Sequence, residues 1–139
     1  MSYAVKEQRE DKPSYSDLGR KEKRLLVKKG IRFVTGNLEH ILNGEPSDLI
    51  NGIDFELSNK FEIDYVPRGI KRFILRKSAE RLTRSIWGSF IYELNCALKL
   101  YEFLGDKERV GLVTREVRIQ KEILQYTPDL EYDPSNGLD

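Results

Sequence analysis

Two series of apolar residues repeat at alternating spacings of four and three, and this pattern constrains the fold more than any other feature of the chain. One series is Val27, Ile31, Val34, Leu38 and Ile41, and the other is Phe90, Leu94, Ala97, Tyr101 and Leu104. Residues at this spacing share one side of an α-helix, as in the seam of a coiled coil. We therefore expect a mainly α protein whose helices pack along these two seams.

Residues that begin or stop helices divide the chain into three predicted helices. Asn43-Gly44-Glu45-Pro46 ends the first helix, because glycine adopts a left-handed conformation and proline cannot continue a helix. Gly105 ends the second helix in the same way, and Thr127-Pro128 ends the third. The predicted helices are residues 17–43, capped by Ser16 or Asp17, residues 67–104, starting at Pro67, and residues 106–126, capped by Asp106.

Between the first two predicted helices the period of the pattern changes to two. The apolar residues of this stretch all stand at odd positions: Ile53, Phe55, Leu57, Phe61, Ile63 and Tyr65. Acidic residues alternate with them: Asp54, Glu56, Glu62 and Asp64. This alternation is typical of β-strands and predicts a β-hairpin over residues 53–66, with its turn at residues 58–60. The predicted fold is a three-helix bundle-like domain with a β-hairpin inserted between the first and second helices, and an α+β arrangement is the alternative.

The domain organisation follows from these elements. Residues 1–15 are polar, so we expect a disordered or loosely ordered arm. Residues 16–127 form the helical domain that contains the hairpin, and residues 128–139 form an acidic tail. No apolar run approaches the roughly 18 residues of a membrane span, and the charged start lacks a signal-peptide core. These observations predict a cytoplasmic protein without a membrane partner.

The residues that usually carry catalysis and metal binding are scarce. Cys96 is the single cysteine and His40 the single histidine of the 139 residues, which excludes disulfides within the chain and zinc sites with several cysteines. No phosphate loop, nucleophile elbow or metalloprotease motif occurs. The hairpin acids on one strand face would stand nearly 7 Å apart, without a calcium-type ligand loop. We therefore expect no enzyme, no catalytic residue, no metal and no cofactor.

Opposite charges are segregated along the chain although the net charge is only +1. Residues 1–32 hold ten basic and five acidic residues, whereas residues 37–66 hold seven acidic residues and one lysine. Residues 68–84 are basic again, and their cations are the predicted nucleic-acid-binding residues: Arg68, Lys71, Arg72, Arg76, Lys77, Arg81 and Arg84. Basic charge around a helix can contact phosphates, and Phe73 or Tyr65 can stack on an unpaired base. Two other interpretations remain, a solvated helix face and pairing with the acidic hairpin.

These patterns predict a non-catalytic nucleic-acid-binding or ribonucleoprotein-assembly subunit that contacts phosphates through a basic helix. The alternative is a protein–protein adaptor or inhibitor that uses its opposite charge patches and its apolar helix seams. Either function includes a protein partner or a homo-oligomer, because the first helix has no evident partner for its seam within the chain. The predicted protein interface is that seam, formed by Val27, Ile31, Val34, Leu38 and Ile41.

Overall fold

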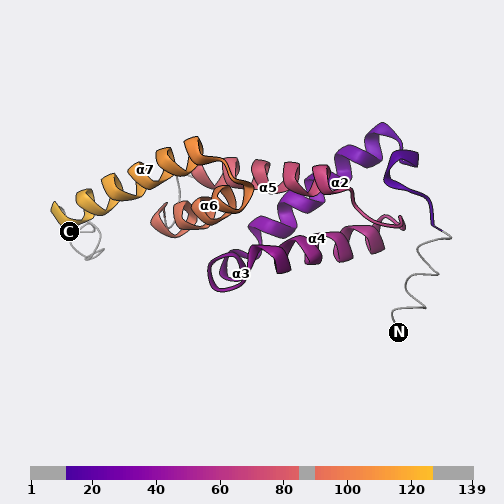
Figure 1. The fold of residues 1–139 in the computed structure, drawn as a ribbon, viewed down its shortest axis with the longest axis horizontal. Coiled ribbons are helices and arrows are strands. Elements are labelled where there is room, and N and C mark those ends of the chain that lie inside the picture. Colours follow the sequence, from indigo (N-terminus) through magenta and orange to yellow (C-terminus); the bar gives the residue numbers. More distant parts are fainter. Residues whose placement is uncertain (1–11, 85–89, 127–139) are drawn as a thin grey trace, which may run out of the picture.

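The computed structural model describes residues 12–84 and 90–126, which form helices and connecting turns without a strand (Figure 1). This confirms the mainly α prediction, although six α-helices take the place of the three expected in this part of the chain. In order they are α2 (Arg20–Thr35), α3 (Leu38–Asn43), α4 (Pro46–Lys60), α5 (Arg68–Thr83), α6 (Phe90–Leu104) and α7 (Lys107–Tyr126), preceded by the short 3-10 helix η1 (Tyr15–Asp17).

The β-hairpin predicted over residues 53–66 is wrong, because most of this stretch belongs to α4. Leu49, Ile53 and Leu57 are spaced four apart and are all buried, so the apolar pattern has a helical period once it is followed from Pro46. Phe55, which an alternating strand would place beside them, is 66% exposed on another side of α4. The α+β alternative fails with the hairpin.

Each of the two long helices predicted from the sequence consists of two shorter helices. The first, residues 17–43, breaks between α2 and α3, where the Thr35 hydroxyl donates to the Ile31 carbonyl and the Asn37 amide donates to the Phe33 carbonyl. These hydrogen bonds satisfy carbonyl oxygens at the end of α2, so the helix can end there. The second, residues 67–104, ends its first half at Thr83 and resumes at Phe90, and residues 85–89 lie outside the description.

The third helix is confirmed with its predicted limits. Gly105 has a positive φ of 76°, the left-handed conformation that ends α6. The Asp106 carboxylate accepts a hydrogen bond from the Arg109 amide at 3.1 Å, as an N-cap of α7 does. The expected tail at residues 128–139 lies outside the description, as do residues 1–11 of the expected arm.

The hydrophobic core lies where α5 packs against α6 and α2. Helix α2 crosses α5, α4 runs beneath α2, and α7 packs along α6 at the other end of the molecule (Figure 1). Ile74, Leu75 and Ala79 of α5 are fully buried, as are Ala97 and Leu100 of α6. The faces of α5 that point away from this core are the ones that can meet a ligand. No helix within the described ranges is both long and apolar enough to cross a membrane.

Candidate nucleic-acid interface

The seven predicted cations lie on α5 and at its C-terminal cap, Arg84, and they differ in what they contact. Two of them hold the fold together. Lys71 Nζ lies 3.8 Å from a carboxylate oxygen of Asp54 in α4, and both side chains are largely buried. Arg72 Nη2 donates to the carbonyl oxygen of Leu104, the last residue of α6, at 2.8 Å. Lys71 and Arg72 are therefore engaged within the chain and are not free to bind a phosphate.

Two further cations share one acidic neighbour at the surface. Lys77 Nζ and Arg84 Nη2 lie 3.5 Å and 4.0 Å from the same carboxylate oxygen of Glu80. Exposed ion pairs of this kind contribute about 0–1 kcal/mol, so a phosphate can compete for either cation. Lys77 also stands 5.5 Å from the centre of the Phe73 ring.

The remaining cations, Arg68, Arg76 and Arg81, are exposed and make no ion pair with another described residue. Arg76 and Arg81, together with the two that share Glu80, form what we call the α5 cationic face: Arg76, Lys77, Arg81 and Arg84. Arg68, nine positions before Lys77, lies on the opposite side of the helix. Phe73 is 42% exposed. It lies on the same side of the helix as Arg76, Lys77 and Arg81, which follow it by three, four and eight positions. Tyr65, the other predicted stacking residue, is also exposed.

The cations do not surround α5 as the sequence pattern predicted. The side of the helix that carries Ile74, Leu75, Ser78 and Ala79 is buried in the core, so positive charge reaches solvent only on the remaining sides. The result is an aromatic ring with cations on one outer surface. This arrangement can contact a phosphate backbone and stack on a base at the same time.

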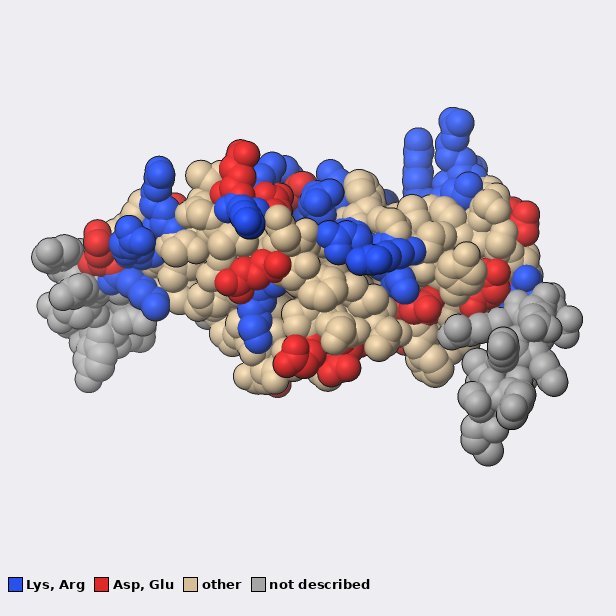
Figure 2. Space-filling model, viewed as in Figure 1, with Lys and Arg blue, Asp and Glu red and all other residues tan. Residues whose placement is uncertain are grey.

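A second basic surface lies on α2 and was not among the predicted site residues. It consists of four exposed cations, which we call the α2 cationic face: Lys21, Arg24, Lys28 and Arg32. Their spacing of three, four and four keeps them on one side of the helix. Figure 2 shows Lys and Arg side chains standing out along the upper right edge of the molecule, over α2. This spacing, already present in the basic stretch of residues 1–32, was the signal that could have identified the face.

The residues predicted as a protein interface lie largely inside the chain. Val34 and Ile41 are fully buried, and Val27, Ile31 and Leu38 pack against the core. Helix α5 packs on α2, and α6 packs on α3, so these helices supply the partner that the seam lacked in the sequence. Val34 and Ile41 are consequently closed to a second protein.

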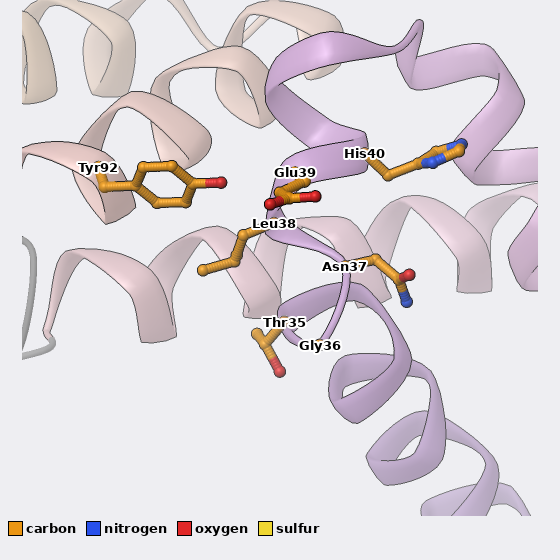
Figure 3. A pocket seen from close by; sticks show the side chains of 7 residues that line it. All are labelled: Thr35, Gly36, Asn37, Leu38, Glu39, His40 and Tyr92. Atoms are coloured by element: carbon orange, nitrogen blue, oxygen red, sulfur yellow. The ribbon is translucent and has the colours of Figure 1, made fainter.

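A hollow of about 460 Å³ lies at the turn between α2 and α3 (Figure 3). Its lining is Thr35, Gly36, Asn37, Leu38, Glu39, His40 and Tyr92. The Tyr92 hydroxyl points toward Glu39, whereas the imidazole of His40 points away from both (Figure 3). Thr35 and Asn37 are already bonded to carbonyls at the end of α2. The hollow therefore does not bring a nucleophile next to His40.

The thiol of Cys96 is held in an apolar and unreactive setting. It is fully buried, and its Sγ donates a weak hydrogen bond of 3.6 Å to the Leu38 carbonyl. Burial, with a smaller contribution from Glu93, raises the pKa of Cys96 to about 11, while Lys99 acts in the opposite direction. A thiol with this pKa is almost entirely protonated near neutral pH. The described residues also contain no cluster of three or more potential metal ligands.

Comparison of the chain with protein-family models, with curated proteins and with solved structures found no match.

Proposed function

We propose that the protein is a non-catalytic nucleic-acid-binding subunit that contacts phosphates through the α5 cationic face. The observation that carries this proposal is the exposed Phe73 ring among cations, two of which, Arg76 and Arg81, have no acidic partner in the described part of the chain. Phosphate contacts supply sequence-independent affinity, and an exposed aromatic ring stacks on any base.

The arrangement favours a single strand over a duplex. Bases of a single strand can turn outward and stack on an aromatic side chain, whereas those of a duplex are already stacked on one another. A single strand can also follow the outer surface of one helix. Phosphate contacts alone would not discriminate between the two forms, so the discrimination depends on Phe73.

The test is the binding of fluorescently labelled single-stranded and duplex DNA and RNA of equal length, measured by anisotropy. We expect Phe73→Leu to weaken single-strand binding by about 1–3 kcal/mol, that is about five- to 150-fold, because leucine keeps the apolar volume but removes the ring. Duplex binding should change much less. Arg115→Ala on α7 is the matched surface control and should leave both affinities unchanged, since Arg115 lies on another helix.

Two results would contradict the proposal. The absence of binding to any of the four nucleic acids at low salt, where electrostatic attraction is least screened, would exclude this function. Hydrolysis of a bound strand would show that the protein is an enzyme. Equal losses of single-strand and duplex affinity in Phe73→Leu would contradict the stacking role of Phe73.

A further inference from the structure

The outer surface of α4 is the electrostatic opposite of the α2 cationic face. Glu45, Asp48 and Glu56 are exposed, and Phe55 beside them is 66% exposed. We call these four residues the α4 acidic face. Asp and Glu side chains gather along the lower edge of the molecule, beneath α3 and α4, whereas Lys and Arg stand over α2 at the opposite edge (Figure 2).

Neither face is neutralised by the described part of its own chain. None of the cations of the α2 face and none of the three acids of the α4 face forms an ion pair with another described residue. The single acid of α2, Glu22, accepts a hydrogen bond from the amide of Gly19, so it caps the helix and does not pair with a cation. Both surfaces thus expose charge of one sign to whatever binds them.

The two faces also match in length and in composition. The α2 face extends over twelve residues from Lys21 to Arg32, and the α4 face over twelve from Glu45 to Glu56, about 16 Å in each case. Each contains one exposed apolar side chain among its charges, Leu25 at 46% exposure and Phe55 at 66%. An apolar centre within a charged rim is the usual composition of a protein–protein contact.

The faces of one molecule cannot satisfy each other. Helices α2 and α4 pack together, with the Phe33 ring against Gly52, which lies between Asp48 and Glu56 on α4. The four cations of the α2 face lie on other sides of α2 than Phe33, so they point away from α4. A contact between the faces therefore requires two molecules.

We propose that the α2 cationic face of one molecule binds the α4 acidic face of a second copy, head to tail. A second copy carries the required opposite charge, the matching length and an apolar partner for Leu25, whereas a phosphate backbone offers nothing apolar to that side chain. Such a contact joins two different surfaces, so every bound pair keeps one free face of each kind and can add further copies. This inference is independent of the proposed nucleic-acid site on α5.

The test uses two charge-reversed variants of the full chain, Arg24→Glu/Lys28→Glu on α2 and Asp48→Lys/Glu56→Lys on α4. Sedimentation equilibrium of nuclease-treated protein at about 50 mM salt, where screening is weak, gives the association constant. We expect the wild type to associate, and each variant alone to associate at least about tenfold more weakly. Arg115→Glu/Arg118→Glu and Glu116→Lys/Glu122→Lys on α7 produce the same changes in net charge at other exposed positions and should associate like the wild type.

Mixing the two variants gives the sharpest result. The α2 variant keeps a normal α4 face and the α4 variant keeps a normal α2 face, so the mixture should associate with wild-type affinity.

Several outcomes would overturn the proposal. The first is that the wild type is monomeric at about 200 µM, and the second is that the mixture of variants remains monomeric. The third is that either variant associates as strongly as the wild type while circular dichroism shows that its fold is unchanged. A fourth is that the α2 variant loses oligonucleotide binding and keeps its self-association. That result would assign the α2 face to nucleic acid instead.

Discussion

Gly30 of α2 and Ile74 of α5 are in such close contact that a Cβ atom at position 30 would lie 2.6 Å from Ile74 Cδ1. Glycine usually weakens a helix by about 1 kcal/mol relative to alanine, so its presence inside α2 has a cost. The close approach explains why it is there. The absence of a side chain at position 30 lets α2 and α5 cross at short range and bury Leu26 and Val34 on either side.

This contact predicts that Gly30→Ala lowers the free energy of unfolding by about 1–3 kcal/mol, because the clash outweighs the gain in helix propensity. Denaturant unfolding followed by circular dichroism measures the change. The control is Gly111→Ala in α7, where an added Cβ would meet nothing within 4 Å and should stabilise the protein by about 0.5–1 kcal/mol. A stability of Gly30→Ala equal to or above wild type would contradict the account of this crossing.

Arg72 and Arg76 are neighbours on α5 with opposite expected roles. Arg72→Ala removes the hydrogen bond to the Leu104 carbonyl and should destabilise the protein by about 1.5–3 kcal/mol, as loss of a bond from a charged donor does. Arg76→Ala removes an exposed side chain and should change stability by less than about 0.5 kcal/mol. Thermal unfolding of the two variants under identical conditions distinguishes them. Equal stability losses would show that Arg72 does not hold the end of α6.

Asp54 joins three parts of the chain through its carboxylate. One oxygen accepts a hydrogen bond from the Val66 amide at 2.7 Å, and the other lies 3.8 Å from Lys71 Nζ. Asp54→Asn can keep the first contact and loses the ion pair, so we expect a loss of about 1 kcal/mol. Asp54→Ala loses both and leaves the Val66 amide unpaired, which should cost about 2–4 kcal/mol. Unfolding of Asp54→Asn and Asp54→Ala with the same midpoint would contradict these separate roles.

The buried thiol of Cys96 predicts both low reactivity and a pH dependence. The folded-state pKa of about 11 lies above the ordinary value of 9.0 for a thiol, so the protonated thiol favours the folded state. Its contribution is complete below pH 9 and is lost as the pH rises through 11, because the unfolded chain releases the proton first. Cys96→Val should therefore flatten the decline in stability between about pH 9 and 11.

Thiol labelling gives an independent reading of the same site. In native protein at neutral pH, Cys96 should react with a maleimide only as fast as the protein opens, and it should react rapidly in denaturant. Rapid labelling of the native protein would contradict its burial.

Local signals in the sequence predicted some elements well and others poorly. The limits of α7 followed from Gly105 and Asp106, because a glycine stop and an N-cap act through the backbone next to them. The hairpin prediction was wrong because it was based on too short a stretch of sequence. Residues 53–57 alternate when viewed alone, whereas Leu49 and Pro46 reveal the helix that contains them.

Tertiary contacts account for what the sequence did not reveal. One side of α5 is buried in the core and is excluded from solvent. Arg72 contacts Leu104, and Lys71 contacts Asp54, and both of these partners are distant in the sequence. Nothing in the pattern of residues 68–84 distinguishes these two cations from Arg76. The seam of α2 and α3 is likewise covered by distant parts of the chain, helices α5 and α6. It had no evident partner in the sequence because α5 and α6 come much later in the chain.

If the exposed cations of α5 contact phosphates, the affinity for nucleic acid must depend on salt concentration. For single-stranded nucleic acid, the logarithm of affinity should fall linearly with the logarithm of salt concentration, with a slope of about 0.7 for each phosphate contacted. Arg76→Ala/Arg81→Ala should reduce the slope by about 1.4, and Arg115→Ala/Arg118→Ala, with the same loss of charge on α7, should leave it unchanged. An unchanged slope in the α5 variant, or an equal reduction in the α7 variant, would contradict the assignment of this face.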